Sequence, residues 1–265
     1  MRLVEGVKSQ FRYDKNEIVG IVVASIALGF IISFRDWGTP LPIISIGLLN
    51  LVNSSLVVFV SLVIATSVQK IIGIRRRNIV NYKVWPIGLV VSVLFAFISN
   101  GAWWILLPGG LIFSSSSILG VGDKLKGNIM HQSRAIVAFA GPLSHLVIAY
   151  IFYYFSGIGI DNYLVGKIVK LNLALAIITL LPIPQPETLI NKFSGMTKEI
   201  KFFQKPTALH GYYIIYHSRI MYAFALSFVV ILSVLLFYVP FVAALILGLL
   251  IASTLSLIWM FAKEF

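Results

Sequence analysis

The chain contains no cysteine. This excludes disulfides, thiolate catalysis and metal centres with cysteine ligands, and it leaves the redox compartment undetermined. Charged residues are also scarce, at 11% of the 265 residues, whereas hydrophobic residues make up 59%. Soluble domains are roughly half apolar and a quarter charged. The composition therefore favours a membrane protein.

Long apolar runs account for this excess. A helix of about 20 apolar residues crosses the hydrocarbon layer, and helices satisfy their own backbone hydrogen bonds there. We therefore expect an all-α membrane protein. The first run is too long for a signal-peptide core and is not followed by a small-residue cleavage site, so it is interpreted as a retained span. The runs are 18–34, 43–72, 86–107, 136–155, 164–183, 221–238 and 240–261.

The basic residues indicate how the runs cross. The net charge is +12 with 21 Lys and Arg, and basic loops are typical of the cytoplasmic side. If 86–107 enters the membrane and returns on the same side, about six transmembrane helices remain, with both termini cytoplasmic, as expected in a cell membrane. Only Arg35, Lys167 and Lys170 then lie on the other side, and the lysines snorkel from a helix end. The alternative is that 86–107 forms a seventh span.

The same pattern defines the expected organisation. Residues 1–17 form a cytoplasmic segment, and 18–265 form one polytopic membrane domain. Within it lie a core at about 43–188, a cytoplasmic loop at about 187–220 and a C-terminal helix pair at 221–261. The lipid bilayer is the expected partner. Nucleic acid is not, because the chain has no basic module with interleaved aromatic residues.

Three motifs lie within this core. AGPLSH at 140–145 opens one apolar run, NLALAIITLLPIPQPE at 172–187 closes another, and VWPIG at 84–88 lies at the entry to the run that re-enters. Taken together, their order and spacing resemble the site-2 protease family of intramembrane zinc metalloproteases. The resemblance covers roughly residues 18–188. It implies a site-2-protease-like fold and, in an intact member, a zinc cofactor.

The residues that hold zinc in the family are missing here. The family needs two histidines one helical turn apart, a glutamate beside the first as general base, and a distant aspartate. The matching positions carry Ala65, Thr66 and Gln69, with Glu187 at the aspartate. A methyl group binds no metal, and a neutral amide is a poor zinc ligand. No two of the four histidines are four residues apart. We therefore expect no catalytic residue, no metal site and no cofactor.

Some polar residues near the motifs remain as candidates. A cleft lined by His145, Thr179, Pro182 and Glu187 is the expected binding site. Glu187 and His145 together provide too few ligands for a structural zinc. The simpler interpretation places Glu187 at a helix end and gives His145 a hydrogen bond to a neighbouring helix.

His210 and His217 are a second candidate pair. They are seven residues apart, so one helical face would carry both, within a group of tyrosines. This pattern fits either a recognition surface or an interfacial helix in an aromatic belt, and the belt is the preferred interpretation.

Three functions are compatible with this sequence. The preferred one is a pseudoprotease that binds a single-span membrane protein without cutting it. The first alternative is an active intramembrane metallopeptidase with a non-standard metal site, which would lose peptide cleavage on chelation. The second is a transporter, although membrane-buried ionisable residues, which usually mark a conduction path, are scarce.

Overall fold

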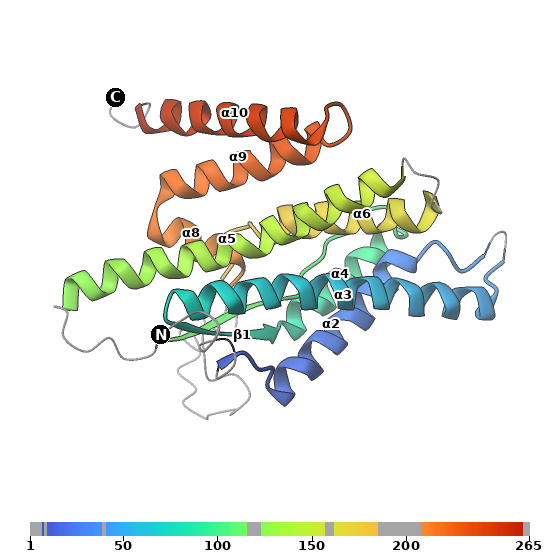
Figure 1. Cartoon of the computed structure of the whole chain (residues 1–265). Helices are drawn as coiled ribbons and strands as arrows, with labels where there is room; N and C mark the ends of the chain where they lie inside the picture. The colour runs from blue at the N-terminus through green and yellow to red at the C-terminus, as the bar shows by residue number, and fades with distance from the viewer. Residues whose placement is uncertain are drawn as a thin grey trace.

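A computed structural model gives the fold of the chain and describes residues 7, 10–38, 41–115, 123–156, 162–184 and 208–261. Most of these residues are helical, and the longest helices run side by side (Figure 1). The elements are α2 (Lys15–Ser33), α3 (Ile44–Arg75), β1 (Asn78–Val84), α4 (Pro86–Ile98), β2 (Gly109–Ser115), α5 (Asp123–Ser156), α6 (Asn162–Ile178), α8 (His210–His217), α9 (Arg219–Leu235) and α10 (Phe241–Phe261).

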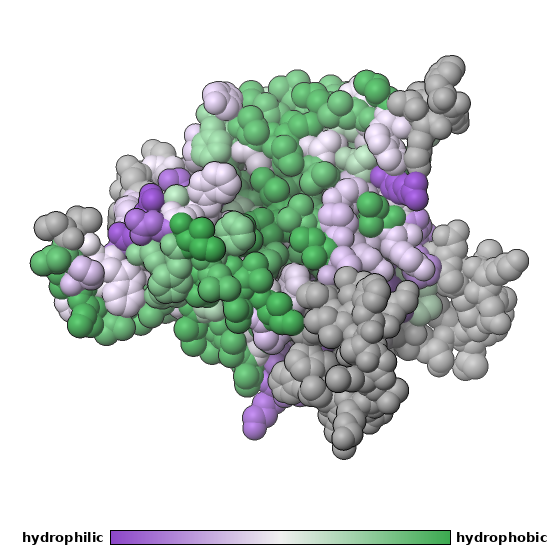
Figure 2. All heavy atoms as spheres, turned by 180° about the vertical axis from the view of Figure 1, so that it is seen from behind, coloured by the Kyte–Doolittle hydropathy of each residue, from purple (hydrophilic) through white to green (hydrophobic). Residues whose placement is uncertain are grey.

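Four helices in the described part of the chain are long and apolar enough to cross a membrane. They are Lys15–Ser33, Ile44–Arg75, Met130–Ser156 and Phe241–Met260. Two further apolar helices, α4 and α9, are shorter. Figure 2 shows apolar residues across the broad middle of one face, with hydrophilic residues toward its margins. The four long helices fit the expected integral membrane protein.

The all-α expectation holds for most of the described residues, but residues 78–84 and 109–115 are strands. There β1 and β2 pair as an antiparallel two-stranded sheet, in which Asn78 is opposite Ser115 and Val84 is opposite Gly109. The basic residues of 70–83 do not by themselves indicate a strand. The alternating burial of Asn78, Val80 and Tyr82 instead gives a half-buried strand, the environment that β-branched and aromatic residues favour.

The apolar run 86–107 is not one long helix. Helix α4 ends at Ile98, and the next turn has positive φ at Asn100 (48°) and Gly101 (67°), a conformation that stops a helix. The chain then runs on to β2. Because Val84 and Gly109 are paired, the segment between them begins and ends at the same place in the fold.

Helices α2 and α3 pack closely at one point. A Cβ on Gly29 would lie 2.7 Å from the Ser55 backbone, so only glycine allows this approach. Helix α5 packs against α3, α6 and α8, and α9 leads from α8 to the outer helix α10. One core cluster lies between α5, α6 and α9, and a second lies between α2, α3 and α6. Helix α3 contacts both α5 and α6, so its inner face is central to the bundle.

Candidate functional site

The side chains of Ala65, Thr66 and Gln69 on α3 point in two directions. Ala65 and Gln69 are one helical turn apart and both are buried, at 3% and 1% exposure. Thr66 is also buried, but its hydroxyl donates to the Leu62 carbonyl oxygen at 2.7 Å and lies 2.9 Å from the Tyr13 hydroxyl. The N-terminal segment therefore covers Thr66, whereas Gln69 faces α5.

Gln69 meets α5 where that helix is interrupted. Pro142 lies inside α5 and has no N–H, so the carbonyl of Ala138, four residues earlier, has no donor within the helix. Gln69 Nε2 lies 3.5 Å from this oxygen, a long hydrogen bond. A Cβ on Gly141 would come within 2.3 Å of Gln69 Nε2, so glycine provides the room. The amide thus fills the space beside the proline and supplies the missing donor.

A second hydrogen-bonded group lies one turn further along α5. The His145 Nδ1 and Asn172 Oδ1 atoms are 2.9 Å apart, and Asn172 Nδ2 donates to Ser61 Oγ at 3.1 Å. Because the amide nitrogen of Asn172 also donates to the Ile168 carbonyl, its oxygen accepts from histidine. His145 is therefore assigned a proton on Nδ1. The expected hydrogen bond of His145 to a neighbouring helix is confirmed.

His210 and Gln69 both lie beside Gly141. His210 begins α8 and is 8% exposed, and its Nε2 would lie 2.9 Å from a Cβ on Gly141. The Nδ1 atom of His210 is buried without a hydrogen-bond partner. Burial lowers the pKa of His210 to about 3, and the nearby His145 adds to the effect. The aromatic-belt interpretation is therefore wrong for His210, because tertiary packing turns this residue inward. We call Ser61, Gln69, His145, Asn172 and His210 the polar cluster.

Backbone contacts hold α8 against the end of α6. The Gly211 N–H donates to the Thr179 carbonyl at 3.1 Å, and a Cβ on Gly211 would lie 1.7 Å from the Leu180 oxygen. Ala208, just before α8, forms isolated β-bridges with Leu111 and with Pro184. Glycine at 211 is thus required for α8 to reach the polar cluster.

The residues expected to form a binding cleft are only partly together. His145 lies in the polar cluster, while Thr179 is 1% exposed and donates its hydroxyl to the Leu175 carbonyl within α6. Pro182 is exposed, unlike these two buried side chains. Glu187 lies outside the described residues. His145 and Thr179 are therefore packed within the bundle, where they stabilise helices.

The resemblance to site-2 proteases implies a zinc ion in an intact member of that family. Among the residues that the structure describes, no three His, Asp or Glu side chains are grouped closely enough to hold a metal ion. The donor set also fits zinc poorly, because His145 Nδ1 is engaged by Asn172 and the Gln69 amide is turned toward Ala138. Zinc usually needs three or four nitrogen, sulfur or carboxylate ligands. The described residues do not fit that group.

Asn172, His210 and Tyr13 were not identified as partners of these positions. Asn172 is the first residue of the motif at 172–187, but an asparagine in a motif does not reveal which helix its side chain faces. His210 is 141 residues from Gln69 in sequence, counted from their numbers. No local pattern links residues so far apart, so only the folded chain brings them together.

Comparison with known proteins adds no family assignment. No protein-family model, no curated protein and no solved structure matches this chain. The geometry of the described residues therefore carries the functional argument.

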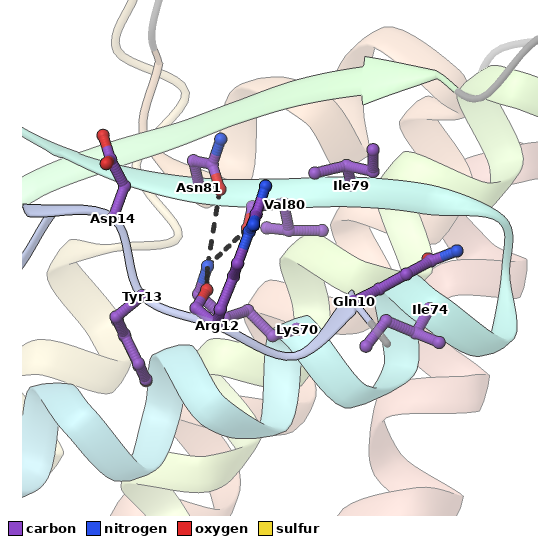
Figure 3. A pocket seen from close by; sticks show the side chains of 9 residues that line it. All are labelled: Gln10, Arg12, Tyr13, Asp14, Lys70, Ile74, Ile79, Val80 and Asn81. Carbon is purple, nitrogen blue, oxygen red and sulfur yellow. Dashed lines mark hydrogen bonds between the residues drawn. The ribbon is translucent and has the colours of Figure 1, made fainter. Parts of the chain in front are cut away.

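A charged group lies at the start of α2, near the Thr66 side of α3. Lys70 Nζ donates to Glu17 Oε2 at 2.9 Å, to the Val80 carbonyl at 2.9 Å and to the Arg12 carbonyl at 3.1 Å. Glu17 also accepts from the Tyr82 N–H at 2.6 Å. Figure 3 shows Lys70 reaching from α3 toward β1 and the N-terminal segment beside a hollow of about 670 Å³. This buried ion pair joins three parts of the chain.

Proposed function

We propose that this chain is a non-catalytic relative of the site-2 proteases that acts by binding a membrane-spanning partner. One observation carries the proposal. The positions matched to the metal ligands and the base hold an alanine, a threonine bonded to Tyr13 and a glutamine beside a proline-interrupted helix. Each replacement is accommodated by its surroundings, so the polar cluster serves the fold.

The replacements account for the loss of chemistry. A general base must accept a proton near neutral pH, and the Thr66 hydroxyl instead donates to the Leu62 carbonyl. Ala65 has no ligand atom. The remaining capability of this region is to hold α3, α5 and α6 in fixed relative positions.

Two charged groups support the membrane placement. Glu17 pairs with Lys70 at the start of α2, and Asp36 pairs with Lys167 just beyond its end. The 19 residues of α2 span about 28 Å at the usual rise per residue, close to the hydrocarbon thickness. The proposed topology has about six spans with both termini cytoplasmic. The pairing of Val84 with Gly109 supports a re-entrant segment between them in this topology.

A surface on α3 provides the proposed contact for a partner helix. Leu48, Val52, Leu56, Val60 and Ile64 follow one another at four-residue spacing and are 42–57% exposed. This α3 stripe runs along a 32-residue helix that is longer than a bilayer requires. In the proposal, an apolar single-span helix packs along it.

Restoring the ligands tests the relationship to the proteases. We expect an Ala65→His, Gln69→His variant to bind about one zinc per chain by metal analysis, with Glu187 as a third ligand, because zinc proteases use such a set. A Val60→His, Ile64→His variant is the matched control, since it has the same spacing on the exposed face. No zinc in the restored variant, or stoichiometric zinc with peptide cleavage in the unmodified chain, contradicts the proposal.

Binding is tested separately by photo-crosslinking in the native membrane. The chain has no cysteine, so a single Leu56→Cys carries the probe without background labelling. An Ile246→Cys variant is the control, because Ile246 is similarly exposed on α10, at 52% against 57% for Leu56. We expect a single-span protein to crosslink at position 56 alone. Lipid adducts alone at both positions would refute partner binding.

A further inference from the structure

Three cations from two distant parts of the sequence line one hollow. Arg35 follows α2, and Lys167 and Lys170 lie on α6, and all three border a space of about 560 Å³ together with Asp36, Trp104 and Tyr163. We call this space the α2–α6 hollow. In Figure 1 the end of α2 and the start of α6 both lie toward the right of the view.

Among the described residues that line this hollow, cations outnumber anions. Asp36 forms an ion pair with Lys167 and accepts a hydrogen bond from the Tyr163 hydroxyl at 2.5 Å. Lys167 was expected to snorkel to the surface, but this ion pair holds it in place. Neither Arg35 nor Lys170 forms an ion pair with any residue that the structure describes, and both are exposed. Two positive charges are therefore left beside the hollow.

Arg35 is held in a fixed position. Its Nε donates to the Asn100 carbonyl at 2.7 Å, in the turn that follows α4. This bond uses one of the five guanidinium donors, and the other four have no hydrogen-bond partner within the described part of the chain. A guanidinium fork matches two oxygens of one phosphate, whereas an ammonium such as that of Lys170 acts as a point charge. The pair suits a phosphate group.

The surroundings favour a phosphate that belongs to a lipid. The hollow lies at the opposite end of α2 from the Glu17–Lys70 pair, about one hydrocarbon thickness away. That depth is the level of lipid headgroups, where tryptophan and tyrosine such as Trp104 and Tyr163 are enriched. Beside the hollow, Trp103 is 71% exposed. A headgroup would meet cations and its chains would meet apolar side chains.

The distribution of basic residues along the sequence also favours an anionic ligand in this hollow. In the proposed topology Arg35, Lys167 and Lys170 are the basic residues that lie on the non-cytoplasmic side, where such residues are disfavoured. The fold gathers all three around one space. We propose that the α2–α6 hollow binds the phosphate of an anionic phospholipid. The placement of these three residues on the non-cytoplasmic side rests on the proposed function and its topology, whereas their positions around the hollow do not.

Native mass spectrometry of the full-length chain in detergent tests this site. We expect one phosphatidylglycerol to be retained in preference to phosphatidylcholine. An Arg35→Gln, Lys170→Gln variant should retain it about tenfold less, since hydrogen bonds to charged groups are lost. An Arg75→Gln, Arg76→Gln variant is the control, because it removes the same charge from the far end of α3 and should bind like the unmodified chain.

The arms of the experiment separate the sources of phosphate. If millimolar inorganic phosphate displaces phosphatidylglycerol from the unmodified chain, the site recognises the phosphate group itself. If it does not, the lipid chains contribute to binding. Equal retention by both double variants, or no preference over phosphatidylcholine, overturns the proposal. Circular dichroism confirms that each variant is folded. These results do not depend on crosslinking at the α3 stripe, so the two proposals fail independently.

Discussion

The buried pair of Glu17 and Lys70 provides the sharpest test of how the N-terminal segment is held. The exposed fractions of their side chains are 2% and 6%, so solvent screens the charges little. Lys70 also donates to two backbone carbonyls, and Glu17 accepts from the Tyr82 N–H. Removing either partner leaves a buried charge without its counter-charge.

We expect each single change to lower the free energy of unfolding by about 3–5 kcal/mol, the usual cost of breaking a buried pair. The changes are Glu17→Gln and Lys70→Met. The double variant should cost less than the sum of the two, because it buries no unpaired charge. The difference should be about 2–3 kcal/mol, which lies within the range of couplings between contacting residues.

The assay is unfolding in mixed micelles, followed by tryptophan fluorescence as a denaturing detergent is added. Trp85 directly follows β1 and is buried with Leu107 and Leu209, so its emission reports the packing around this end of β1. Arg75→Gln is the control. Arg75 is exposed on the last turn of α3, and its loss should change stability by no more than about 0.5 kcal/mol. Additive effects of Glu17→Gln and Lys70→Met would refute the reasoning.

Two further predictions concern the polar cluster. Gly141→Ala should destabilise the chain by about 1–3 kcal/mol, because the added Cβ would displace the Gln69 amide. Gly166→Ala is the control, since a Cβ there would meet nothing within 4 Å, and this change should be neutral or stabilising. Both variants are compared with the unmodified chain by detergent unfolding. Burial lowers the pKa of His210 from 6.5 to about 3. Between these pH values the unfolded chain binds more protons than the folded chain, so the free energy of unfolding falls as the pH falls. His210→Asn should flatten this pH dependence by up to about 1.4 kcal/mol per pH unit, and an unchanged slope would contradict the burial of a neutral His210.

Several features of the fold follow from local sequence patterns. The runs 18–34 and 43–72 correspond to α2 and α3 within a few residues, because continuous apolar stretches form helices where lipid is the solvent. The expected return of 86–107 to the same side implied a turn within that run, and the structure places a turn at Asn100 and Gly101. The strands were missed, since β1 carries charged and polar residues among its apolar ones and β2 is rich in glycine.

Some features of the candidate site follow from the sequence, whereas others appear only in the folded chain. The sequence alone determined that Ala65, Thr66 and Gln69 lack the groups of a hydrolytic zinc centre, because side-chain chemistry does not depend on the fold. It also predicted that the long apolar runs form helices, because their hydrophobicity is local. Only the tertiary structure decided that Gln69 lies at the carbonyl freed by Pro142, that His210 turns inward, and that Arg35 joins Lys167 and Lys170 around one hollow. These residues are 69 to 141 positions apart in the sequence. Their proximity depends on how helices pack, which no local pattern encodes.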